Sequence, residues 1–149
     1  MTILSVAAKW LALAGLLGAS LAHGQSNWLT LVGDPANPAV NTIDVDPRIA
    51  VLTERLRTMK LRVNRAAQRL SRDGLPYRSF EAEVLIDCVA RVGHYNLATF
   101  YMEPLWKGLP HTTVVYPTDR PRTMEFRSVE PNPTERIIRA ACQATGSSD

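Results

Sequence analysis

The residues most suggestive of chemistry lie in the stretch EVLIDCVARVGH, where Asp87 adjoins Cys88 and His94 follows six residues later. A nucleophilic thiolate needs a lowered pKa and a base held beside it. Apolar residues alternate along this stretch, so Asp87 and Cys88 should lie on opposite faces of a strand. The separation between Cys88 and His94 corresponds to about 20 Å of extended chain. The pattern therefore gives little support to a catalytic pair.

A second group of residues suited to ligand binding is basic. Between Arg48 and Arg78, eight arginines and Lys60 stand against only Glu54 and Asp73, hence a net charge of +7, whereas the whole chain carries +3. Arginine presents a planar fork that suits phosphate and sulfate. The segment therefore predicts a face for polyanions such as sulfated glycans, lipopolysaccharide phosphates or phospholipid head groups. The candidate anion-binding residues are Lys60, Arg62, Arg65, Arg69 and Arg72. The alternative is a solvated basic face that acidic residues balance elsewhere in the fold.

The sequence contains no motif for the other kinds of chemistry considered. No phosphate-binding loop, dinucleotide fingerprint, nucleophile elbow or zinc-protease motif is present. His94 and His111 are seventeen residues apart and have no partners at ligand spacing, so neither a metal nor a cofactor is expected. Glu81, Glu83 and Asp87 share one side of a strand, which we interpret as a solvated face rather than a general acid–base pair.

The first 24 residues have the pattern of a secretory signal peptide. Lys9 precedes the apolar run from Trp10 to Gly18, and small residues follow. The run is too short to span a bilayer, which takes about 20 apolar residues. Cleavage is expected after Gly24, or alternatively after Ala22. No cysteine lies near either site, so no lipid anchor is expected.

The mature chain, residues 25–149, is expected to be one soluble exported domain in the periplasm, in the medium or at the cell surface. Export bears on the cysteines, because an even number in an oxidising compartment favours a disulfide. A bridge between Cys88 and Cys142 is therefore predicted. Two free structural thiols and a reactive Cys88 are the alternatives. Export and the lack of an interleaved aromatic platform also argue against nucleic-acid binding.

Several strands are expected in the mature chain. The clearest covers residues 80–92, where Phe80, Ala82, Val84 and Ile86 alternate with polar residues. A turn or bulge is expected at Gly93. The other expected strands cover residues 28–32, 40–46, 94–103, 112–117 and 123–129.

A C-terminal helix is expected after these strands. Its start is marked by Asn132 as N-cap, Pro133 at the first helical position and Glu135 three residues after the cap. Gly146 is expected to end it. Cys142 lies on its apolar face, so a helix packed on the sheet can bring this cysteine to Cys88.

Residues 48–70 are ambiguous. A stripe of apolar residues recurs every three or four positions, as in a helix, and consists of Leu52, Leu56, Met59, Val63, Ala66 and Leu70. Residues 59, 61 and 63 also alternate with Lys60, Arg62 and Asn64, as in a half-buried strand whose solvent side carries the latter three. Considered in isolation, the segment favours a helix.

The order of short motifs resembles the surface-adhesin protein E-like family of Gram-negative bacteria. The motifs are NWLTLVG, IDVDPRI, IDC and PNPTERIIRAAC, and they extend over nearly the whole mature chain. The resemblance implies an antiparallel sheet with a C-terminal helix, pairing of the two matching cysteines, and a strand around Met59 to Val63. It implies adhesion to host matrix or serum proteins and no catalytic residues. The best-described member is a lipoprotein, whereas this chain lacks the lipid-attachment cysteine.

Taken together, the sequence predicts an α+β fold in which a C-terminal helix packs on an antiparallel β-sheet and one disulfide ties the two. The predicted function is that of an exported, non-enzymatic, adhesin-like binding protein. The alternatives are a periplasmic protein that binds a polyanion or envelope polymer and, third, a Cys/His hydrolase. The expected partners are host or envelope macromolecules, either proteins or polyanionic glycans, with no nucleic acid, cofactor or transmembrane segment.

Overall fold

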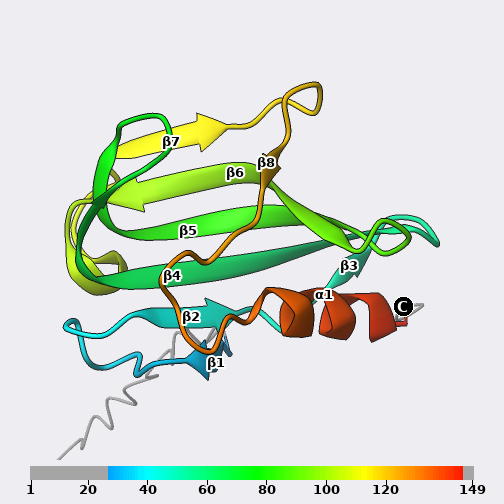
Figure 1. The fold of residues 1–149 in the computed structure, drawn as a ribbon, viewed down its shortest axis with the longest axis horizontal. Coiled ribbons are helices and arrows are strands. Elements are labelled where there is room, and N and C mark those ends of the chain that lie inside the picture. Colours follow the sequence, from blue (N-terminus) through cyan, green and yellow to red (C-terminus); the bar gives the residue numbers. More distant parts are fainter. Residues whose placement is uncertain (1–26, 146–149) are drawn as a thin grey trace, which may run out of the picture.

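A computed structural model describes residues 27–145, so the expected signal peptide and Gly146 lie outside the described residues. An antiparallel sheet has the strand order β1-β2-β4-β5-β6-β7, with β3 beside β4 and β8 beside β6 (Figure 1). The strands are β1 (Leu29–Val32), β2 (Thr42–Val45), β3 (Ala50–Val51), β4 (Leu56–Leu70), β5 (Pro76–Asp87), β6 (Val92–Tyr101), β7 (Thr112–Val115) and β8 (Arg122–Thr123). A short 3-10 turn, η1 (Pro104–Trp106), and the helix α1 (Thr134–Gln143) complete the described elements. The predicted fold class is confirmed.

Residues 56–70, which in isolation favour a helix, form the long strand β4. It pairs with β2 and β3 on one side and with β5 on the other. Met59, Leu61 and Val63 are at most 4% exposed, whereas Leu52 and Leu70 of the expected helical stripe are 54% and 68% exposed. The helical interpretation is wrong, and the strand that the resemblance implies around Met59 to Val63 is confirmed, because strands on both sides satisfy the backbone of β4 and the alternating residues fill the core.

The strand expected over residues 80–92 ends at Asp87, and the chain reverses over the next four residues. The Asp87 side chain accepts hydrogen bonds from the backbone N–H groups of Val89 (3.0 Å) and Ala90 (2.9 Å). Arg91 then adopts a left-handed conformation, with φ of 59°. This aspartate turn closes the β5–β6 hairpin. The turn expected at Gly93 is therefore misplaced, because Gly93 belongs to β6.

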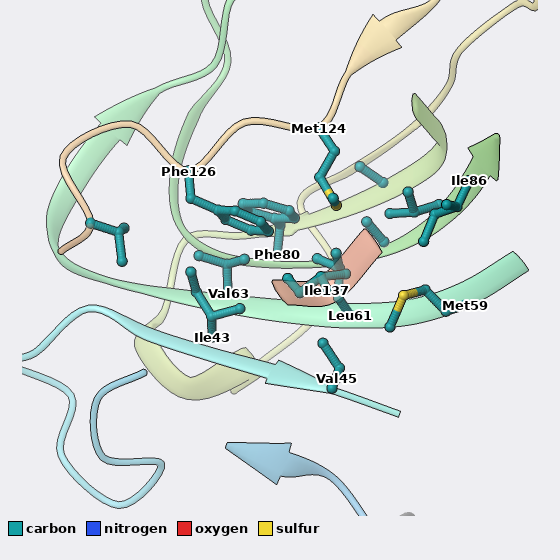
Figure 2. Packing of buried hydrophobic residues seen from close by; sticks show 14 of the residues in the cluster. Ile43, Val45, Met59, Leu61, Val63, Phe80, Ile86, Met124, Phe126 and Ile137 are labelled. Carbon is teal, nitrogen blue, oxygen red and sulfur yellow. The ribbon is translucent and has the colours of Figure 1, made fainter. Parts of the chain in front are cut away.

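Past β8 the chain crosses the sheet and covers its inner face, which is the face that carries Met59, Leu61 and Val63. Figure 1 shows this crossing segment passing over the sheet before it enters α1. Met124 and Phe126 point from it into the core and are each 1% exposed (Figure 2). The strand expected over residues 123–129 is therefore wrong beyond Thr123.

Gly93 permits the close approach of this crossing segment. The Met124 N–H donates to the Gly93 carbonyl at 2.8 Å. A Cβ at Gly93 would lie 3.1 Å from the terminal carbon of Met124. The glycine therefore leaves room for this packing and forms no turn.

The helix α1 packs Ile137, Ile138 and Ala141 against the same core. Its N-cap is Pro133 instead of Asn132, whose side chain accepts from the Thr134 N–H at 3.0 Å. The helix ends at Gln143, before the expected Gly146.

The predicted disulfide joins the β5–β6 turn to this helix. Cys88 and Cys142 are bonded, with their Cα atoms 5.5 Å apart. Cys88 directly follows β5 and is half-buried against the core, as is Cys142.

Candidate functional site

Arg62 is not free to bind an anion. Its Nε donates to Asp44 Oδ2 at 2.8 Å, and the Asp44 side chain is fully buried. The guanidinium carbon lies 4.6 Å from the ring centroid of Trp28 and 4.0 Å from that of Trp106. One carboxylate and two aromatic rings therefore fix this cation on the outer face of the sheet, the face opposite the core.

Asn64, expected on the solvent side with Arg62, is fully buried. Its amide donates to the carbonyls of Pro38 (3.2 Å) and Val40 (2.8 Å) and accepts from the Leu105 N–H at 2.9 Å. The prediction is wrong because the β1–β2 loop and η1 fold over this part of the outer face.

Lys60 is exposed but lies among carboxylates. It lines a hollow of about 360 Å³ on the outer face, with Arg48 and the carboxylates of Asp46, Glu81 and Glu83. Three acidic groups against two basic ones make this hollow a poor anion site. Lys60 therefore does not lie on one face with the other candidate residues Arg65, Arg69 and Arg72.

Asp87 is paired with Arg55 rather than simply solvated. Arg55 Nε donates to Asp87 Oδ2 at 2.8 Å. The Arg55 guanidinium, aided by the N–H of Ala90, lowers the pKa of the Asp87 carboxyl well below its usual range. Because this pKa is lower in the folded protein, the ionised carboxylate stabilises the folded protein at pH values above the unfolded-state pKa of about 3.9. This stabilisation declines as the pH falls below that value.

Replacing this carboxylate should therefore have a pH-dependent effect. We expect Asp87→Asn to lower the free energy of unfolding at neutral pH, and the difference from wild type to shrink in acid. Urea denaturation at several pH values measures it, with Asp119→Asn at an exposed loop position as control. A difference that stays constant down to acidic pH would contradict the role given to the ion pair.

The other three candidate arginines meet at a hollow on the inner face, which we name the Arg65 pocket. It has a volume of about 370 Å³ and lies between the β4–β5 hairpin, β6 and the segment after β8. Its basic lining residues are Arg65, Arg69, Arg72, Arg122 and Arg127, and its acidic ones are Asp73 and Glu125. Its aromatic lining residues are Tyr77, Phe80, Tyr95, Phe100 and Tyr116. Neighbouring rings have centroids 5.3–6.4 Å apart, as in packed aromatic clusters.

Arg65 is the unusual member of this lining. It is only 6% exposed, and its Nη1 donates to the Arg127 carbonyl at 3.2 Å. Its Nε has no hydrogen-bond partner, and no carboxylate of residues 27–145 pairs with it. Burial raises the pKa of the Tyr95 hydroxyl, and the Arg65 charge opposes that rise. A buried charge without a counter-ion is costly, so an incoming anion would be stabilised here.

Ion pairs tie the rim of the pocket together. Arg72 pairs with Glu125 at 2.6 Å, and Arg122 pairs with Asp73 at 2.5 Å. Arg127 also donates to Glu125, and Arg127 and then Arg72 hold the pKa of that carboxyl below its usual range. These pairs connect the turn after β4 with β8 and the segment that follows it.

Sequence reasoning missed the aromatic lining and the contribution of residues 122–127. One signal for Arg65 was present, because it continues the alternation of Met59, Leu61 and Val63 and so occupies a core-facing position. An arginine in that register is unusual, since this residue type is almost never fully buried unless paired.

No family model, curated protein or solved structure matches this chain. Residues 27–145 contain no helix long and apolar enough to cross a membrane. Over the same range no three His, Cys, Asp or Glu side chains are grouped as a metal site requires. The case for function therefore depends on the Arg65 pocket itself.

Proposed function

We propose that this chain is an exported, non-enzymatic binding protein that holds anionic groups of a host or envelope macromolecule in the Arg65 pocket. The observation that carries the proposal is the buried charge of Arg65, which has no acidic partner among the described residues. The lining places five arginines against two carboxylates. Its volume of about 370 Å³ falls within the usual range for ligand pockets, about 300–1,000 Å³.

The bridge between Cys88 and Cys142 argues against the Cys/His hydrolase alternative. A hydrolase of that class attacks through a thiolate. The Cys88 sulfur is bonded to Cys142, so it offers no thiolate while the bridge is intact.

Adhesion and periplasmic binding are two versions of the proposed function. The resemblance to the surface-adhesin protein E-like family supports an adhesin-like role, in which the anionic group belongs to a host macromolecule. Protease treatment of whole cells separates the two. Loss of the protein from intact cells would support adhesion, whereas protection until the outer membrane is opened would support a periplasmic role.

Heparin affinity chromatography tests anion binding in the pocket. We expect the variant Arg65→Gln with Arg69→Gln to elute at clearly lower salt than wild type, because two cations of the pocket are removed. Binding of both proteins should weaken as salt rises, since the Debye length is about 8 Å at physiological ionic strength. Circular dichroism establishes that the variant is folded.

Lys60→Gln with Arg139→Gln is the matched control, because it removes the same charge from exposed residues outside the pocket. We expect it to elute close to wild type. If both double variants elute at equally lowered salt concentrations, the effect comes from net charge alone, and the proposed role of the pocket is overturned.

A further inference from the structure

We infer that the unit bound in the Arg65 pocket is a single anionic sugar ring, with its acidic group at Arg65 and Arg69 and its hydroxyls at the rim. This inference rests on the proposed binding function and specifies its ligand class. The probes that represent it are glucose 6-phosphate and glucuronate.

Two arginines of the pocket have no acidic partner among the described residues, whereas the other three do. Arg65 is buried without a counter-ion, and exposed Arg69 makes no ion pair with the described residues. Arg72, Arg122 and Arg127 are already paired with acids. One anionic group therefore finds two unneutralised cations in the pocket lining, and their guanidinium forks suit a phosphate or carboxylate.

The two acidic residues of the pocket, Asp73 and Glu125, keep carboxylate oxygens that can accept hydrogen bonds. Asp73 binds Arg122 through Oδ1, and Glu125 binds both of its arginines through Oε2. Asp73 Oδ2 and Glu125 Oε1 make no hydrogen bond with the described residues and so remain free to accept. Free carboxylate oxygens attract neutral hydroxyl groups and repel a second anionic group. A ligand unit with one acidic group and several hydroxyls therefore fits this arrangement.

The aromatic lining of the pocket suits a sugar ring. Tyr95 and Tyr116 are part-exposed, and their ring centroids lie 6.4 Å apart. Aromatic faces bind apolar surface, and the Tyr116 hydroxyl adds a polar partner at the edge, whereas the Tyr95 hydroxyl is buried. A pyranose ring has C–H groups on its faces and hydroxyls around its perimeter, so it matches both features.

Isothermal titration of the mature protein tests this inference directly. Glucose 6-phosphate and glucuronate should bind at least about tenfold more tightly than glucose or inorganic phosphate, a difference of about 1.4 kcal/mol. Phenyl phosphate, which has the ring and the anion without the hydroxyls, should also bind more weakly than glucose 6-phosphate. Equal affinity for inorganic phosphate, or tighter binding of phenyl phosphate, would overturn the assignment to a sugar.

Substitutions in the pocket test which residues bind the sugar probes. Arg69→Gln, at an exposed position, should weaken both anionic sugars severalfold, and Arg65→Gln should weaken them further. Glu125→Gln should reduce the preference for glucose 6-phosphate over inorganic phosphate, because it replaces one acceptor oxygen with an amide donor and removes the negative charge that repels a second anion. Arg139→Gln on the outer side of α1 is the control for net charge. Unchanged preference in Glu125→Gln would contradict the role given to the rim.

Failure of this inference is distinguishable from failure of the proposed function. If heparin elution depends on Arg65 and Arg69 but neither sugar probe binds better than inorganic phosphate, the sugar assignment is wrong and the anion pocket stands. If heparin elution is also independent of these residues, the proposed function fails as well.

Discussion

Removing the disulfide with Cys88→Ala and Cys142→Ala is expected to lower the free energy of unfolding by about 4 kcal/mol. The two cysteines are 54 residues apart, and the chain-entropy model assigns that cost to the freedom the unfolded chain regains. A domain of this size has a stability of about 5–15 kcal/mol, so the loss is a large fraction of the total.

The position of the bridge adds a local consequence. It joins the β5–β6 turn to α1, whose residues Ile137, Ile138 and Ala141 are buried in the core. The helix has only ten residues and is too short to persist without tertiary contacts. Fraying of α1 is therefore expected in the double variant, with faster amide exchange at these residues.

Guanidinium chloride denaturation with and without reductant measures the disulfide effect. Reductant should shift the wild-type midpoint towards that of the double variant. The double variant itself serves as control, because reductant should leave its midpoint unchanged. A wild-type midpoint insensitive to reductant, with reduction verified by mass, would show that the bridge contributes little.

Arg62→Gln is expected to be strongly destabilising, by about 3–5 kcal/mol, because it leaves a buried charge without its partner. Asp44 is fully buried, and its Oδ1 already has no hydrogen-bond partner. The substitution also removes the cation between Trp28 and Trp106.

Lys60→Gln is the matched control for this prediction. It makes the same change of charge two residues earlier in β4, at an exposed position, and should alter stability by no more than about 0.5 kcal/mol. Asp44→Asn combined with Arg62→Gln should recover part of the loss, and a double-mutant cycle gives the coupling energy. Similar small effects for Arg62→Gln and Lys60→Gln would contradict the buried ion pair.

The sequence by itself determined the class of the fold and its covalent link. Alternation over residues 80–86 depends only on local geometry, because successive side chains of any strand point to opposite faces. The disulfide followed from two cysteines and an expected oxidising compartment. Export, which bears on both the compartment and the function, remains a prediction from the first 24 residues.

For residues 56–70 the periodicity alone did not decide between helix and strand. The resemblance implied a strand around Met59 to Val63, and the tertiary structure decided for the whole segment. Both periodicities are present in that segment, and pairing with β2 and β5 selects the strand. The pairing also sets Asp44 directly opposite Arg62 in the sheet. Two charges that are eighteen residues apart in sequence thereby become one buried pair.

The tertiary structure also decided which basic residues share a site. The alternation of side chains along β4 places Lys60 and Arg62 on the opposite face from Arg65, but it does not reveal which segments cover each face. Distant segments cover them: the β1–β2 loop and η1 bury Asn64 on the outer face, and residues 122–128 close the Arg65 pocket on the inner face. Burial and counter-ions decide whether an arginine can bind a ligand, and both depend on contacts between residues far apart in the chain.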